Sequence, residues 1–196
     1  MEPDSRDDDM TSWNATLQAI GRIHSPFVEA HGTPVQNYAA QSHAGGLADL
    51  AGTQAHAVTD VRGGRGTLEV FPRWIEALQD LEGCPRIWIL FWVHRAAPTR
   101  TLVLPYRDTT ERGLFSTRAP ARPNPIGISC VRLLGVSDRF VHVAELDALD
   151  GSPLLDIKPY VDGYDAFPGI APAWLDSGSA RHGAMVADGR FEDTGR

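Results

Sequence analysis

The chain has 196 residues, of which 42% are hydrophobic and 22% charged, and its formal net charge is −7. This size and composition are typical of one ordinary globular domain. No apolar run approaches the roughly 18 residues that a membrane-spanning helix needs, and the acidic start, Met1–Asp4, lacks the pattern of a secretory signal. Cys84 and Cys130 match no Cys-x-x-Cys spacing, which argues against a disulfide scaffold or a cysteine zinc site. We therefore expect a cytoplasmic protein without membrane contact.

Charge is distributed unevenly along the chain. Residues 1–9 hold five acidic residues and a single arginine, whereas residues 94–122 hold six arginines against two acidic residues. Arginine recognises carboxylate and phosphate groups through a planar fork of donors. A locally basic loop on an acidic chain suits an anionic substrate or a short phosphate contact, and a solvated loop is the alternative. A non-specific nucleic-acid binder would need a broader basic surface.

The first third of the chain contains few expected elements. Residues 1–16 are polar and acidic, and we expect a disordered leader. Alternating apolar residues predict a short strand over 17–23, and a second strand is expected over 67–71. Large apolar residues are scarce between 29 and 66, which is typical of a functional or disordered connection. We treat 37–66 as a long insertion.

The rest of the chain predicts one helix and a series of strands. Pro72 opens the helix and Gly83 follows it as a cap. The apolar run RIWILFWVH, residues 86–94, predicts a strand buried on both faces. Further strands are expected over 101–104, 113–117, 127–136 and 139–146. After Trp174 the chain turns to Gly, Ser, Asp and Arg, so we expect a flexible tail over 176–196.

Together these elements indicate a mainly β fold. A single expected helix accompanies many strands, which favours a single-domain β-barrel over residues 17–175, with one or two short helices. No glycine-rich strand–turn–helix opens the chain, which argues against a dinucleotide-binding α/β fold.

A proline-rich stretch, residues 118–127, reads RAPARPNPIG. Its three prolines restrict the backbone and stiffen the loop. A rigid loop holds functional groups at low entropic cost, and the groups available here are Arg118, Arg122 and Asn124. The alternative is a stiff corner between strands without a function of its own.

A second stretch, residues 146–160, reads LDALDGSPLLDIKPY. Its Asp-Gly pair predicts a turn, and Asp147 and Asp156 flank that turn among apolar residues. A carboxylate there can hold hydroxyl groups or an amine, or it can cap backbone N–H groups. Asp156 and Lys158, the chain's only lysine, are alternatively a structural ion pair.

These two stretches, read with residues 113–129 (GLFSTRAPARPNPIGIS), resemble the TrmO, or TsaA-like, family of S-adenosylmethionine-dependent tRNA methyltransferases. Supporting matches occur in the family's order: IGRIHSP at 20–26, GTPVQ at 32–36, LEG at 81–83 and LFWVH at 90–94. The resemblance implies a β-barrel of the TsaA-like type that forms a homodimer. It also implies that S-adenosylmethionine binds outside any Rossmann fold.

The resemblance further implies the residues that contact the methyl donor. Arg118 would pair with the donor's carboxylate, Asp147 or Glu145 with its ammonium or ribose diol, and Leu146 and Ile128 would sandwich the adenine. The full implied set is Pro34, Val35, Gln36, His94, Arg95, Arg118, Ile128, Glu145, Leu146 and Asp147. Substrate contacts are expected at Arg122, Asn124, Lys158 and Tyr160.

Methyl transfer is an in-line displacement from which the leaving group departs neutral. The protein mainly has to align the reactants and accept one proton, so a covalent nucleophile is not required. His94 is the candidate base, and a histidine positioned for binding alone is the alternative. The other histidines lack metal-ligand spacing, so we expect no metal site.

The acceptor is less constrained than the donor. The family implies N6 of threonylcarbamoyladenosine, next to the anticodon of a tRNA. A small-molecule acceptor is one alternative, and a non-catalytic S-adenosylmethionine-binding module that regulates a partner is another. Arg95 stands where the family more often has an acid or an amide, and the connection between residues 36 and 67 is longer than usual.

Overall fold

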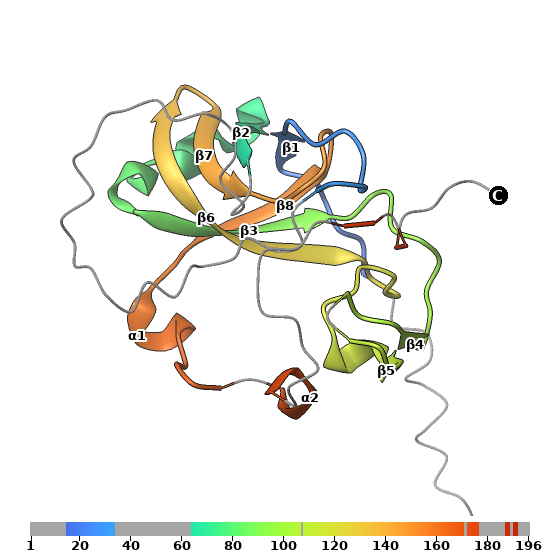
Figure 1. The fold of residues 1–196 in the computed structure, drawn as a ribbon. Helices are drawn as coiled ribbons and strands as arrows, with labels where there is room; N and C mark the ends of the chain where they lie inside the picture. The colour runs from blue at the N-terminus through green and yellow to red at the C-terminus, as the bar shows by residue number, and fades with distance from the viewer. Residues whose placement is uncertain are drawn as a thin grey trace, which may run out of the picture.

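A computed structural model describes residues 15–33, 64–106, 108–170, 172–176, 187–188 and 190–191. Antiparallel strands close into a barrel in the order β1-β2-β7-β6-β3-β8 (Figure 1). They are β1 (Gly21–His24), β2 (Gly64–Val70), β3 (Arg86–Trp92), β6 (Ile126–Ser137), β7 (Phe140–Leu146) and β8 (Pro153–Pro159). The expected mainly β barrel is thus confirmed. Within the described residues, no helix has the length and apolar character needed to cross a membrane.

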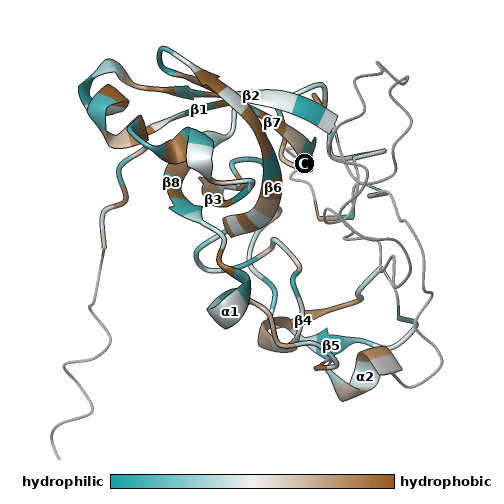
Figure 2. Cartoon of the chain, turned by 90° about the vertical axis from the view of Figure 1, so that its left-hand side faces the viewer, coloured by the Kyte–Doolittle hydropathy of each residue, from teal (hydrophilic) through white to brown (hydrophobic). Residues whose placement is uncertain are grey.

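A small lobe, defined here as residues 97–106 and 108–122, lies apart from the barrel, beyond the ends of β3 and β6 (Figure 2). It contains β4 (Leu102–Val103), β5 (Arg112–Gly113) and the 3-10 helix η5 (Leu114–Ser116). A buried cluster of its own holds it together, formed by Val103, Leu114, Ala119, Ala121 and Phe191. The strands expected over 101–104 and 113–117 are therefore shorter than predicted, and most of the second is helical.

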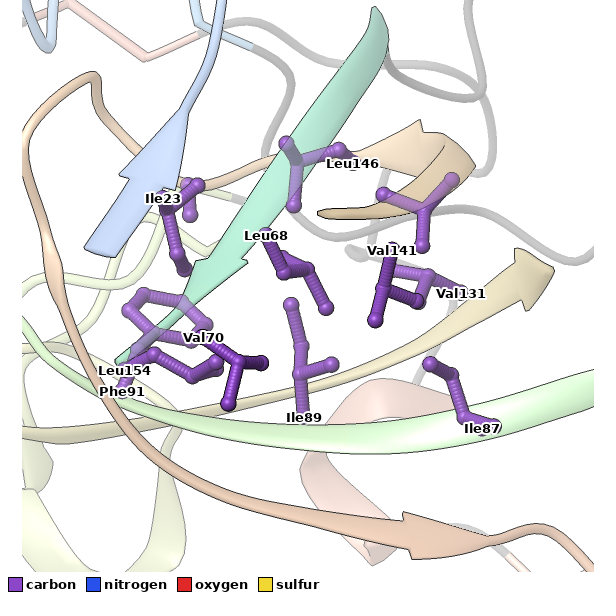
Figure 3. Close-up of a cluster of buried hydrophobic side chains, with 12 residues drawn as sticks. Ile23, Leu68, Val70, Ile87, Ile89, Phe91, Val131, Val141, Leu146 and Leu154 are labelled. Atoms are coloured by element: carbon purple, nitrogen blue, oxygen red, sulfur yellow. The ribbon is translucent and has the colours of Figure 1, made fainter. Parts of the chain in front are cut away.

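Side chains from all of the barrel strands fill the barrel (Figure 3). The fully buried representatives, one from each strand, are Ile23, Leu68, Ile87, Val131, Val141 and Leu154. Gly127 on β6 is required by this packing, because an added Cβ would lie 2.4 Å from the ring of Phe91. The glycine of the proline-rich stretch therefore lets two neighbouring strands approach each other.

The composition of β3 had indicated burial on both faces, but only one face of this strand is buried. Ile87 and Ile89 point into the barrel, whereas Trp88, Leu90 and Trp92 alternate with them and are only partly covered. A closed barrel has one interior, so the second apolar row of such a strand lies on the outer surface. The expectation of double burial was wrong for this reason.

The helix expected from Pro72 consists of two 3-10 helices, η3 (Pro72–Leu78) and η4 (Leu81–Gly83). Between them Asp80 has a φ of 63°, in the left-handed region, which interrupts a regular helix. Two one-turn helices, α1 (Asp162–Asp165) and α2 (Ala173–Asp176), follow β8.

The expected domain boundaries fall partly outside the described residues. The leader and the insertion overlap them only at 15–16 and at 64–66, where the insertion's last residues already belong to β2. Five residues of the tail expected over 176–196 are described, namely 176, 187, 188, 190 and 191, and the flexibility expected of this tail stays a prediction. Among them Phe191 is only 8% exposed.

Candidate functional site

His94 lies just beyond β3, where two other segments meet it. Its Nδ1 is 3.2 Å from Oγ of Ser152, which precedes β8. The N–H of Val93 donates to the carbonyl of Pro125 at 2.8 Å, so the proline-rich loop reaches the same strand end. Partial burial, and after it the charge of Arg95, lowers the pKa of His94 below its usual value. The imidazole is therefore neutral near pH 7 and can accept a proton.

Two arginines flank this strand end. Nη1 of Arg95 donates to the carbonyl of Val28 at 2.5 Å, which ties the loop after β1 to the end of β3. Arg22 lies against Gly151 of the Asp-Gly turn, where an added Cβ would be 3.1 Å from its Nη2. Gly151 also has a φ of 77°, so a side chain here would be both crowded and strained.

Asp147 follows β7 at the corner where the chain turns toward β8. Its Oδ1 accepts a hydrogen bond of 2.5 Å from Oγ of Ser129. Ser129 is only 4% exposed, so this bond fixes one carboxylate oxygen of Asp147 against β6. A carboxylate oriented in this way can bind an ammonium group or a pair of hydroxyl groups.

A β-bulge at Glu145 sets the direction of this corner. Val143 pairs with Gly66 but Leu146 pairs with Gly64, so β7 advances by one more residue than β2. Glu145 carries the bulge with a φ of 66°. Leu146 is thereby fully buried in the core, which leaves only its backbone for the implied adenine contact.

The carboxylate of Glu145 is held by two arginines. Nη2 of Arg86 lies 2.7 Å from its Oε2, and Nε of Arg132 lies 3.6 Å from its Oε1. Since the side chain of Glu145 is only 11% exposed, the structure presents this carboxylate to arginines rather than to an open surface. These ion pairs hold the side chain of Glu145 at the bulge that precedes Asp147.

The three polar side chains of the proline-rich loop differ in what they contact. Nη1 of Arg122 donates to the carbonyls of Thr117 at 3.0 Å and Ala119 at 3.2 Å. Arg122 therefore braces the turn that contains Arg118, and the substrate contact expected of it stays a prediction. Arg118 is exposed and makes no hydrogen bond or ion pair with any described residue, including His94 and Asp147. Asn124 is also exposed.

Three further implied residues lie on the outer face of β6 and on or just after β8. Ile128 is 50% exposed on the outer face of β6. Nζ of Lys158 lies 2.6 Å from Oδ2 of Asp156, which is the structural ion pair considered as the alternative. The hydroxyl of Tyr160 donates to Asp162 at 3.1 Å. Because Lys158 pairs with Trp88 and Tyr160 bonds to Arg86, these two residues lie toward the end of β3 opposite to His94, whereas Ile128 pairs with Leu90 in the middle of the strand.

The remaining implied donor contacts, Pro34, Val35 and Gln36, lie outside the described residues. Sequence reasoning missed three residues that orient predicted binding side chains. They are Ser152 beside His94, Ser129 beside Asp147 and Arg86 beside Glu145. The sequence showed only that these residues occur inside strands or beside turns. Which side chains they contact depends on how the strands pair.

The fold and these contacts define a class of protein. It is an antiparallel barrel with an appended lobe. Its candidate binding residues lie on the corner after β7, at the end of β3 and on a stiff loop that carries arginines. The chain belongs to the TrmO family, because residues 22–166 match the family described as tRNA-methyltransferase O N-terminal domain.

Individual proteins are similar over much of the chain. A probable S-adenosyl-L-methionine-binding protein of Pyrococcus abyssi is 40% identical over 172 residues, which cover 88% of this chain and 82% of that protein. A tRNA (adenine(37)-N6)-methyltransferase of Rattus norvegicus is 31% identical over 81% of this chain and 34% of its own length. The crystal structure of TrmO from Pseudomonas aeruginosa matches with a TM-score of 0.61 and 34% identity. The match covers 84% of this chain and spans 64% of that TrmO chain.

Proposed function

We propose that this chain is an S-adenosylmethionine-dependent methyltransferase whose acceptor is N6 of threonylcarbamoyladenosine, next to the anticodon of a tRNA. The observation that carries the proposal is the family match over residues 22–166. Its relatives include proteins named for S-adenosyl-L-methionine binding and for tRNA adenine-37 N6 methylation. We also propose a cytoplasmic location, where a tRNA substrate is available.

Several described residues suit the chemistry of this reaction. The donor, when bound, supplies a methyl group on a sulfonium and departs as a neutral thioether. As the bond from N6 to the methyl carbon forms and the sulfur–carbon bond breaks, N6 loses a proton, which the neutral imidazole of His94 can take. Asp147 is held by Ser129 and suits the donor's ammonium or ribose, while the exposed Arg118 suits its carboxylate. The implied backbone contacts of Pro34, Val35 and Gln36 complete the set.

The test is to incubate the chain with methyl-labelled S-adenosylmethionine and either total tRNA or a small-molecule extract. We expect label in tRNA, at threonylcarbamoyladenosine, and none in tRNA from cells unable to make that nucleoside. Label in the small-molecule pool alone overturns the tRNA assignment. Donor binding without transfer to either pool overturns the enzymatic assignment and supports a binding module.

A small-molecule acceptor is the second candidate. The formal net charge of −7 favours it, because a protein that binds RNA through the phosphate backbone gains affinity from positive charge. The basic segment over residues 94–122 is the opposing observation, since it offers arginines for a local phosphate contact.

We further propose that the protein is a homodimer joined through the outer face of β3 and β6. Trp92 pairs with Ile126 and Leu90 with Ile128 on that face. Ile126 is 38% exposed and Ile128 50% exposed, beside the partly covered side chains of β3. Figure 2 colours much of these two strands as hydrophobic. A contiguous apolar surface of this kind is typical of a covered interface.

Ile126→Glu is expected to convert the protein to a monomer, because a charge at the centre of an apolar interface cannot be paired there. Size-exclusion chromatography with light scattering measures the change in mass. Leu17→Glu is the control, since Leu17 is also exposed, at 50%, but lies before β1. A wild-type protein that is monomeric at working concentration contradicts the proposed dimer.

A further inference from the structure

Residues 187–188 and 190–191, here called the strap, lie after the region that matches the family, which ends at residue 166. Ala187 exchanges two backbone hydrogen bonds with the loop after β1. The N–H of Gly32 donates to the carbonyl of Ala187 at 2.8 Å, and the N–H of Ala187 donates to the carbonyl of Thr33 at 2.8 Å. The strap therefore pairs with this loop like a short strand.

The other end of the strap is buried in the lobe. Phe191 is 8% exposed and belongs to the lobe's apolar cluster. Its carbonyl accepts the N–H of Ala97 at 2.8 Å, three residues after His94. Its ring meets that of Tyr106 edge to face at 5.3 Å. Phe191 is thus an anchor that joins the strap to the segment after β3.

Arg190 reinforces this anchor. Its guanidinium lies 4.8 Å from the centre of the Tyr106 ring, and its Nη1 donates to the carbonyl of Leu104 at 3.4 Å. Burial raises the pKa of Tyr106 to about 12, so the ring that Arg190 covers stays neutral. Arg190 also pairs with Asp188 within the strap, which orients its side chain.

The segments that the strap joins are those that carry the predicted donor contacts. The loop after β1 is tied to Arg95 through Val28 and to the Asp-Gly turn through Phe27, whose carbonyl accepts the N–H of Asp150 at 2.7 Å. The lobe carries Arg118. The strap connects the two segments, because Ala187 bonds to the loop after β1 and Phe191 bonds to Ala97 of the lobe.

We propose that the strap is a positioning element of the methyl-donor site. Phe191 anchors it in the lobe, and the backbone of Ala187 bonds it to the loop after β1. This inference rests on the proposed function. The strap fixes the distance between the loop, the segment that carries His94 and Arg95, and the lobe that carries Arg118. Phe191 is buried in the lobe's apolar cluster and Ala187 bonds through its backbone, so we assign both a positioning role and no ligand contact.

The experiment measures S-adenosylmethionine affinity by calorimetry for the full chain and its variants. Phe191→Ala is expected to raise the Kd about fivefold, and Phe191→Leu to restore most of the affinity, because leucine still fills the apolar cluster. Ala187→Pro removes the N–H that bonds to Thr33 and is expected to raise the Kd about threefold, whereas Ala187→Ser keeps that N–H and the wild-type affinity.

The matched control for the anchor is Phe167→Ala, which removes the same side chain from a position that is 75% exposed. Circular dichroism monitors the barrel in every variant. If Phe191→Ala unfolds the barrel, Ala187→Pro alone decides the result. If the wild-type chain binds no S-adenosylmethionine, the proposed function itself fails. If the wild type binds it and both Phe191→Ala and Ala187→Pro bind equally well, the strap is not a positioning element.

Discussion

Asp147→Ala is expected to weaken S-adenosylmethionine binding at least tenfold, which corresponds to about 1.4 kcal/mol. Oδ1 of this carboxylate is fixed by the hydroxyl of Ser129, so it meets a ligand without first losing side-chain freedom. The donor's ammonium or ribose diol would lose a charge-assisted partner. Isothermal titration calorimetry measures the affinity directly.

Two companion variants separate the charge of Asp147 from its hydrogen bonds. Asp147→Asn keeps an oxygen for Ser129, so it should fold normally, and it should lose affinity as strongly as alanine if the ligand is the ammonium. Partial retention of affinity indicates the ribose diol instead. Asp156→Ala removes a carboxylate that pairs with Lys158 and should leave the affinity unchanged. Wild-type affinity in Asp147→Ala would remove this residue from the donor site.

Much of the barrel is visible in the sequence because its strands alternate. Val141 and Val143 are buried on either side of the exposed His142, which is the period of a half-buried strand. β8 was not predicted, since Pro153 and Pro159 bound it and Asp156 interrupts it. It forms because β1 and β3 pair with it on either side, a non-local cause that no local pattern reveals.

The candidate site was less predictable than the fold for the same reason. The proline-rich loop and the Asp-Gly corner were recognisable as stretches, but the partners of their side chains come from distant strands. Glu145 is not a residue type that favours a positive φ, so its bulge becomes visible only through the pairing of β7 with β2. Phe191 stands in a polar stretch and is buried only because the lobe offers it an apolar cluster.

The second large effect is expected at Arg118, whose replacement by alanine should also weaken S-adenosylmethionine binding at least tenfold. Arg118 is exposed and has no partner among the described residues, so none of these residues competes with a ligand carboxylate for its guanidinium. A bidentate pair with that carboxylate depends on the planar guanidinium, and Arg118→Lys should therefore recover little. Calorimetry with 5′-methylthioadenosine, which lacks the amino-acid part of the donor, gives the decisive comparison. Arg118→Ala should leave its affinity unchanged.

Arg122 provides a matched comparison for Arg118, because it is an arginine of the same loop that bonds to the protein's own backbone. Its bonds to the carbonyls of Thr117 and Ala119 brace the turn that holds Arg118. Arg122→Ala should thus weaken S-adenosylmethionine binding by a smaller factor, about threefold, and should lower the thermal stability, whereas Arg118→Ala should not. If Arg122→Ala has the larger effect on affinity while the protein remains as stable as the wild type, the two assignments must be exchanged. Arg122 would then be the arginine that meets the donor.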